Sequence, residues 1–247
     1  NVTKLKKGDE VCALLKGGGY AEYVCAPALQ CLSIPSGVSL MDAGALPETF
    51  CTVYTNLIDR GALRKGECVL IQGGTSGIGY TAIQIAKFIG AKVLATGRTI
   101  EKCDAIRRFG ADRAINYVEE DFEIIAKDFT DGNGVDVILD IVGGPYIPKE
   151  LNILAKNGRL VFVNLRAGKV VEADFGQIHA KHLTVTGSRL RPRSIAEKAA
   201  ICRSLKQKIW PAFGTGDIEV EVFRRFSFEK AAEAHMLMES SAHIGKI

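Results

Sequence analysis

A glycine-rich stretch at residues 73–79 carries the clearest chemical signal in this sequence. It reads Gly-Gly-Thr-Ser-Gly-Ile-Gly, follows the apolar run 69–71 and precedes an amphipathic stretch from Tyr80 to Phe88. A buried strand, a glycine turn and a helix start in this order are typical of a dinucleotide-binding βαβ unit. Glycines let the backbone approach a pyrophosphate, and the helix N-terminus offers N–H groups and the positive end of its dipole. A glycine string alone also fits an ordinary turn, so the flanking patterns carry the interpretation.

The residues after the next predicted strand, 92–96, indicate which cofactor the site prefers. An Asp or Glu that binds the ribose 2′-hydroxyl is expected ~20 residues after the glycines. The sequence has Gly97 and Arg98 there, and Lys102 one turn later. A guanidinium pairs with a 2′-phosphate, whereas a carboxylate binds a free hydroxyl. We therefore expect NADP(H) rather than NAD(H), with a solvated helix start at Arg98 and Lys102 as the alternative.

Composition excludes several other classes of protein. Apolar residues make up 47% of the 247 residues, and the net charge is only +4 with interleaved signs. The sequence has no basic run that would indicate nucleic-acid binding, and no apolar run near the ~18 residues of a membrane-spanning helix. The seven cysteines are scattered without a Cys-x-x-Cys pair, which favours a reducing compartment and leaves a structural zinc site without ligand pairs. We expect a cytoplasmic protein that acts on a small molecule, although a leader lost with the N-terminus stays open because the sequence does not begin with Met.

The elements that must position the glycine motif alternate between strand and helix. Such alternation predicts an α/β fold with a doubly wound parallel sheet. The ends of the chain differ, because short strand patterns at 10–15, 20–26 and 31–35 and another at 219–226 lie outside this region, and three short strands cannot bury a core alone. In the middle of the chain we predict strands at 69–71, 92–96, 113–117, 135–140, 159–163 and 183–187, and helices at 49–62, 80–88, 100–109, 119–129 and up to 157.

Several motifs in this order resemble one family, the medium-chain dehydrogenase/reductases, in their zinc-independent quinone oxidoreductase (zeta-crystallin-like) branch. The resemblance covers essentially the whole chain. It rests on the stretches 18–24, 46–49, 73–79 with 82–87, 115–117, 140–144, 183–188 with 190–193, and 243–247.

The resemblance implies a doubly wound Rossmann sheet beside a partial β-rich, GroES-like catalytic domain. Residues 1–48 would belong to the catalytic domain, 49–190 to the dinucleotide-binding domain, and 191–247 would return to the catalytic domain. Family members have a further half-domain before the region that matches Asn1 and a last strand after Ile247. The chain therefore looks truncated at both ends, and part of the substrate pocket would lie in the missing segment.

The resemblance also implies which residues bind the cofactor. Ser76, Gly77 and Ile78 would lie along the pyrophosphate and the nicotinamide ribose. The residues that would hold the 2′-phosphate are Gly97, Arg98, Lys102 and Tyr117. Val142, Asn164 and Leu190 would line the cofactor cleft at strand ends, and Thr52 would face the nicotinamide. For Tyr117 and Thr52, ordinary packing in the sheet edge or a helix is the alternative. The implied cofactor-binding residues are Thr52, Ser76, Gly77, Ile78, Gly97, Arg98, Lys102, Tyr117, Val142, Asn164 and Leu190, and no catalytic residue is implied.

Metal chemistry and a short-chain dehydrogenase are the main alternatives for this motif set. The zinc enzymes of the superfamily have a cysteine ligand where this sequence has Glu48, and Cys51 is displaced by three positions. A short-chain dehydrogenase needs Tyr-x-x-x-Lys, and none of the six tyrosines has a lysine four residues on. We therefore expect metal-free chemistry. Cys51 is not expected to be a nucleophile, because its setting is apolar and no histidine lies near it in sequence.

These observations lead to an NADPH-dependent quinone oxidoreductase that transfers hydride without metal or flavin to a quinone or other electron-poor acceptor. One alternative is an enoyl-thioester or alkenal reductase of the same superfamily. A cofactor-binding crystallin-like or RNA-associated protein is an alternative of another class. We also expect a homodimer through strand 183–187, because this uncharged strand would form the open edge of the sheet.

Overall fold

A computed structural model describes residues 2–247 of the chain, which form two compact units. The central unit is the continuous segment Thr55–Ser188. The terminal unit combines the segment up to Tyr54 with Arg189–Ile247. No helix among the described residues is long and apolar enough to cross a membrane.

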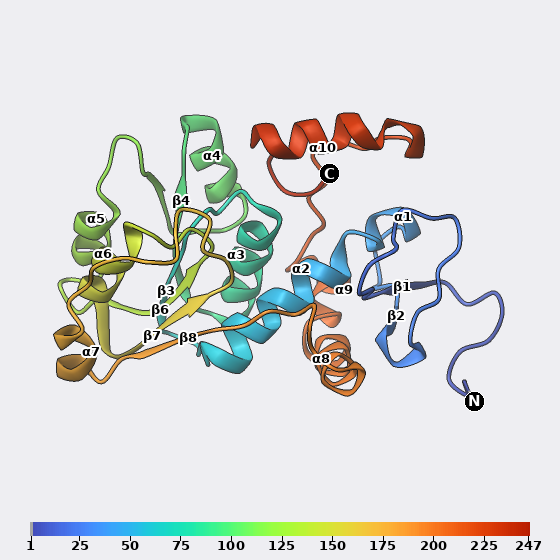
Figure 1. Ribbon diagram of the computed structural model, residues 1–247, viewed down its shortest axis with the longest axis horizontal. Helices are drawn as coiled ribbons and strands as arrows, with labels where there is room; N and C mark the ends of the chain where they lie inside the picture. Colours follow the sequence, from blue (N-terminus) through green and yellow to red (C-terminus); the bar gives the residue numbers. More distant parts are fainter. Residues whose placement is uncertain (1) are drawn as a thin grey trace. The chain divides into compact units, whose positions relative to one another are not determined.

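The central unit is built on one six-stranded sheet with the strand order β5-β4-β3-β6-β7-β8 (Figure 1). Every neighbouring pair of strands is parallel. This confirms the predicted α/β fold with a parallel sheet. The strands are β3 (Cys68–Ile71), β4 (Lys92–Gly97), β5 (Arg113–Asn116), β6 (Val135–Asp140), β7 (Leu154–Phe162) and β8 (Thr184–Gly187).

Helices cover this sheet because its central strands are apolar on both sides, as parallel strands usually are. All four residues of β3 are buried. Leu70 pairs with Leu94 of β4 and with Ile138 of β6, and these side chains join one core with residues of α5 and α6. Helices α3 and α4 contact β3, β4 and β5. The helices of this unit are α3 (Gly77–Ile89), α4 (Ile100–Arg108), α5 (Phe122–Phe129), α6 (Tyr146–Ile153) and α7 (Gly176–Lys181).

The two ends of the central unit meet. Ser188 Oγ donates a hydrogen bond to Asn56 Oδ1 at 2.9 Å, and Arg60 Nη1 donates to Thr186 Oγ1 at 3.3 Å. The chain therefore leaves the central unit next to the point at which it entered it.

Two predicted helix boundaries in this region are wrong. The helix expected to reach residue 157 ends at Ile153, because Leu154 is already extended and pairs with Val135 at the start of β6. Asn157 has φ +61°, which no α-helix can accommodate. The helix expected at 49–62 begins as α2 (Leu46–Val53) and continues as a π-helix, η2 (Tyr54–Arg60).

The terminal unit contains a small antiparallel pair, β1 (Val11–Ala13) with β2 (Cys31–Ser33). Its core packs Phe50 of α2 against Trp210 and Phe213, with ring centroids 6.0 and 5.4 Å away. Trp210 Nε1 donates to Ser33 O at 2.8 Å, which satisfies the indole N–H. The remaining elements are η1 (Ala28–Gln30), α1 (Leu40–Ala43), α8 (Ile195–Lys208), α9 (Pro211–Thr215), η3 (Phe228–Lys230) and α10 (Ala231–Ser240).

Two strands predicted for this unit are wrong. Residues 20–26 form no strand, and Tyr23 is 92% exposed. Residues 219–226 contribute only an isolated bridge between Val222 and Lys246. Alternation of apolar and polar residues makes a strand only where a partner strand and a core face exist, and within residues 2–247 neither segment joins a sheet.

Candidate cofactor-binding site

The strand order reverses between β3 and β6 at the centre of the sheet. From β3 the chain proceeds through α3 to β4 and β5 on one side, and β6 then pairs with the other side of β3. Ligands of open α/β sheets bind outside the carboxyl ends of the strands at such a switch point. The candidate site is therefore the edge where β3 to β7 end.

The glycine motif closes a tight loop between β3 and α3. Ser76 is the N-cap of α3, with its Oγ accepting from Gly79 N–H at 2.9 Å and donating to Gly73 O at 2.8 Å. A Cβ on Gly79 would lie 2.2 Å from Gly73 O, so the loop and the first turn are in direct contact. Gly73 has φ +74°, a conformation that suits glycine. The loop thus presents the N-terminus of a thirteen-residue helix at the switch point, where the helix dipole favours an anion.

The structure brings most of the predicted cofactor-binding residues to this edge. Each of them ends a strand of the central sheet, follows one directly, or begins the next helix. Thr52 and Leu190 are different, because both are buried within the terminal unit, and their predicted roles stay predictions. Those at the carboxyl edge are Ser76, Gly77 and Ile78 after β3, Gly97, Arg98 and Lys102 at and after β4, Tyr117 after β5, Val142 after β6, and Asn164 after β7.

Two cations lie together at the end of β4. The pKa of Lys102 is lowered by partial burial and by the charge of Arg98, so the two charges are close in space. Thr99, between them in the sequence, caps α4 by accepting from Lys102 N–H. Gly97 leaves no room for a side chain, because its Cβ would lie 3.0 Å from Ile106 Cδ1. Two adjacent cations on a helix N-terminus suit a dianion such as a phosphate monoester.

Tyr117 is hydrogen-bonded through its backbone to Gly97, the residue that precedes Arg98. Its N–H donates to Gly97 O at 3.1 Å, which ties the end of β5 to the end of β4, and its side chain is 39% exposed. Burial raises the pKa of Tyr146 to about 12, and the nearby phenol of Tyr117 adds to the effect. Tyr146, at the start of α6, therefore belongs to the same edge. The sequence interpretation did not include it.

A chain of buried polar side chains runs beneath the site, and its role was also missed. Thr96 Oγ1 accepts from Gly73 N–H and donates to Gln72 Oε1, both at 2.9 Å. Gln72 Nε2 donates to Glu150 Oε1 at 3.0 Å. The carboxyl group of Glu150 lies near that of Asp140, whose charge contributes, after burial, to raising the pKa of Glu150. We refer to Thr96, Gln72, Glu150 and Asp140 as the buried relay.

Asp140, the last residue of the relay, forms hydrogen bonds with the loop after β6. Asp140 Oδ1 accepts from Val142 N–H at 2.6 Å, and Oδ2 accepts from Gly143 N–H at 2.8 Å. The relay therefore joins the glycine loop to the loop that carries Val142. One signal in the sequence pointed to it: Asp140 follows the apolar run 137–139 at the end of a buried strand. Glu150 gave none, because a carboxylate in an amphipathic helix usually faces water.

Two of the seven cysteines, Cys51 and Cys202, lie next to each other in the terminal unit. Cys51 and Cys202 lie 4.0 Å apart between their Sγ atoms, and both are buried. Hydrogen bonding to Cys202 and burial raise the pKa of Cys51, so it remains a thiol. Among residues 2–247, no three His, Cys, Asp or Glu side chains are arranged to hold a metal ion.

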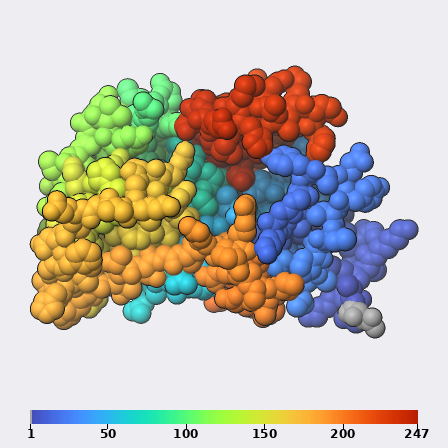
Figure 2. All heavy atoms as spheres, in the orientation of Figure 1, coloured from blue at the N-terminus to red at the C-terminus, as the bar shows by residue number. Residues whose placement is uncertain are grey.

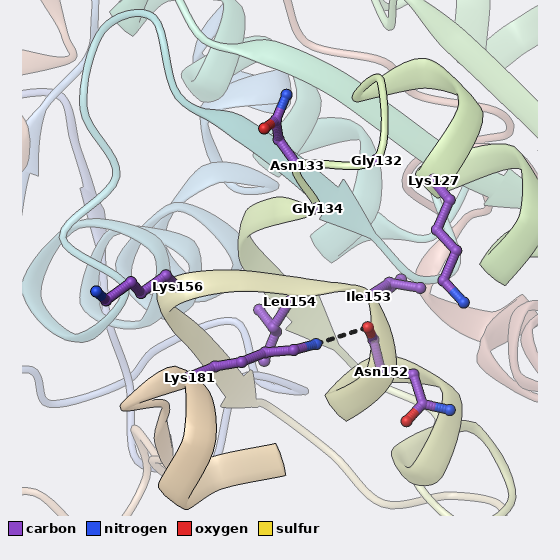
Figure 3. A pocket seen from close by; sticks show the side chains of 9 residues that line it. All are labelled: Lys127, Gly132, Asn133, Gly134, Asn152, Ile153, Leu154, Lys156 and Lys181. Atoms are coloured by element: carbon purple, nitrogen blue, oxygen red, sulfur yellow. Dashed lines mark hydrogen bonds between the residues drawn. The ribbon is translucent and has the colours of Figure 1, made fainter.

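A separate hollow of about 220 Å³ lies at the opposite edge of the sheet, where β6 and β7 begin (Figure 3). Gly134 and Asn152 line it together with Lys127, Lys156 and Lys181. Lys181 Nζ donates to Asn152 O at 2.7 Å, so it closes part of the wall. None of the predicted cofactor-binding residues lines this hollow.

Comparison with known proteins places the chain in a family. Residues 77–203, more than half of the chain, match the family model described as Zinc-binding dehydrogenase. The chain is 28% identical over its whole length to the quinone oxidoreductase-like protein 2 homolog of Nematostella vectensis and covers 68% of that protein. The described residues do not on their own fit the zinc ion of the family's name.

Solved structures agree with this assignment. The quinone oxidoreductase of Thermus thermophilus, also solved with NADPH, has a TM-score of 0.85 at 29% identity, with 98% of this chain and 76% of that chain covered. The JamJ enoyl reductase has a TM-score of 0.80 at 25% identity, with 99% and 72% covered. The chain therefore belongs to the medium-chain dehydrogenase/reductase superfamily of oxidoreductases, in its quinone oxidoreductase-like branch.

Proposed function

We propose that this protein is an NADPH-dependent quinone oxidoreductase that works without metal or flavin. The observation that carries the proposal is the pair of cations Arg98 and Lys102 at the end of β4, where an NAD-dependent enzyme has a carboxylate. The NADPH complex of the Thermus relative supports the same cofactor. Ser76, Gly77 and Ile78 would contact the pyrophosphate and ribose, and Arg98, Lys102 and Tyr117 the 2′-phosphate.

The chemistry asks little of the protein beyond binding and orientation. Bound NADPH would supply a hydride to the acceptor. A quinone spreads the accepted negative charge over its ring, so no general acid has to act in the hydride step. The glycine loop and the strand ends then orient the cofactor, and positioning supplies much of the rate acceleration.

The proposal is tested by NADPH oxidation with a panel of quinones, enones, enoyl thioesters and alcohols. We expect turnover with quinones, a preference for NADPH over NADH, and no loss of activity after treatment with a metal chelator. The chain spans 68% of the length of the Nematostella relative and 74% of the length of the human quinone oxidoreductase. Alcohol oxidation alone, abolished by the chelator, would contradict the proposal.

The same panel of acceptors, together with an RNA-binding assay, distinguishes quinone reduction from two other functions. Similarity to the JamJ enoyl reductase favours an enoyl or alkenal reductase, which would reduce activated alkenes but not quinones. For a crystallin-like or RNA-associated protein we expect no turnover, together with RNA binding that NADPH displaces and that falls steeply with salt.

We also propose a cytoplasmic homodimer that forms through β8. This strand is at the edge of the sheet and carries no charge from Leu183 to Gly187, and Val185 is 41% exposed. The segment that includes β8, drawn in orange, lies at the surface of the central unit (Figure 2). An unprotected edge of this kind is usually paired or covered, and a two-fold axis would pair it with its own copy.

The variant Val185→Lys tests this interface. A lysine at the centre of β8 would place two like charges across the two-fold axis, so we expect the dimer to dissociate in light scattering. Val170→Lys is the matched control, because Val170 is 95% exposed in the same unit but outside the strand. A wild-type monomer, or a dimer that both variants leave intact, would contradict pairing through β8.

A further inference from the structure

The buried relay contains two carboxyl groups in one dry site. Asp140 and Glu150 are both 0% exposed, and their carboxyl groups lie close enough for each to affect the pKa of the other. Two carboxylates are acceptors only, so a hydrogen bond between them requires that one carries a proton. Their charges would otherwise repel in a region of low dielectric constant.

The surrounding donors identify Glu150 as the protonated member. Both oxygens of Asp140 accept backbone N–H groups, those of Val142 and Gly143, which favours its ionised form. Glu150 Oε1 accepts from Gln72, whereas Oε2 receives no hydrogen bond from any donor among residues 2–247. An oxygen without a donor, beside an ionised carboxylate, is where the proton belongs.

We propose that Glu150 is a positioning residue that stays protonated and, as a hydrogen-bond donor to Asp140, holds the glycine loop and the loop after β6 in register for the cofactor. The inference rests on the proposed cofactor function. Glu150 acts from the sheet side of these loops, through Gln72 and Thr96 toward Gly73 and through Asp140 toward Val142. It is assigned no contact with the cofactor itself.

The proposal predicts a direction of pH dependence. Burial, followed by the charge of Asp140, raises the pKa of Glu150 well above its ordinary value, and burial raises the pKa of Asp140 to about 6. Tyr146 of α6 also faces the pair, and its pKa of about 12 keeps it neutral. Gln72 of β3 and Thr96 of β4 do not ionise.

A raised pKa of an acid in the folded state means that its stabilising contribution is complete at low pH and is lost as pH rises through the folded-state pKa. Ionised Glu150 would repel Asp140 and break the donor end of the relay. Cofactor affinity and stability therefore both fall toward alkaline pH. One proton limits the slope of the affinity to about tenfold per pH unit.

The test compares wild type with Glu150→Gln and Glu150→Leu. Glutamine keeps an acceptor for Gln72 and a donor for Asp140 but cannot ionise, so we expect NADPH affinity within about twofold of wild type near neutral pH and no alkaline loss. Leucine leaves Gln72 and Asp140 without their partner, and we expect binding weaker by about tenfold or more at every pH. Glu172→Gln, at a glutamate of the same unit outside the relay, is the control and should keep the wild-type profile.

Two measurements without cofactor separate this inference from the proposed function. The infrared C=O band of a protonated carboxyl group should be present in wild type near neutral pH and absent in Glu150→Gln, and the unfolding midpoint should lose its alkaline slope in that variant. A wild type that binds no NADPH, yet shows the band, would contradict the proposed function and with it the coupling to cofactor. Binding with the same pH profile in wild type and Glu150→Gln would overturn the inference alone.

Discussion

Replacing Gly79 by alanine is expected to destabilise the central unit by about 3 kcal/mol or more and to abolish NADPH binding. The added Cβ would lie 2.2 Å from Gly73 O and 2.6 Å from the backbone of Gly74. Overpacking typically costs about 1–3 kcal/mol when side chains can move aside. Here the obstacle is backbone that is itself held by Ser76 and Thr96, so the loop and the first turn of α3 must separate.

Chemical unfolding and NADPH titration measure the two effects of Gly79→Ala. Gly17→Ala is a control for the substitution itself, because a Cβ there meets no atom within 4 Å and its φ is not in the left-handed region. We expect that control to be neutral in both measurements. A Gly79→Ala protein with the unfolding free energy of wild type would show that the glycine loop is not packed as described.

The second large effect is expected from removing the cationic pair. Arg98→Ala and Lys102→Ala should each weaken NADPH binding by about 10- to 100-fold, since a hydrogen bond to a charged group contributes about 1.5–3 kcal/mol. NADH has no 2′-phosphate, so its affinity should change little. The two effects should not add fully, because the side chains share one ligand group and their charges interact.

Titration of each variant with NADPH and with NADH measures this selectivity. Arg108→Ala is the matched control, because Arg108 is an exposed arginine in the last turn of the same helix. A parallel loss of affinity for both cofactors would show that Arg98 and Lys102 support the fold rather than the 2′-phosphate. Unchanged binding of NADPH would contradict the predicted cofactor preference.

Elements whose own residues decide their structure could be predicted from the sequence, whereas elements that need a partner from elsewhere in the chain could not. Strand β3 is a continuous apolar run, β6 contains the apolar run 137–139, and the glycine motif marks its own turn, so these elements could be placed from the sequence. Residues 20–26 and 219–226 alternate like strands but have no partner strand in the described structure, and alternation contains no information about partners.

The site was predictable to the same extent. Strand ends and the glycine loop follow from the pattern, and the parallel sheet brings them to one edge. Glu150 could not be found in this way, because an acidic residue on an amphipathic helix looks solvated until the fold shows what covers it. The different protonation states of the pair, with Asp140 ionised and Glu150 protonated, depend on which hydrogen-bond donors reach each carboxyl group. The sequence pattern does not show these donors.

The contact between Asn56 and Ser188 has a consequence for the order in which the protein folds. The central unit leaves the ribosome as one uninterrupted segment, whereas the terminal unit has to wait for residues made after it. Once the sheet has closed, the flanking segments at Tyr54 and Arg189 emerge side by side. Folding of the central unit has by then already cost the chain entropy of bringing these two distant segments together. The terminal unit therefore assembles as if its two parts were joined by a short loop.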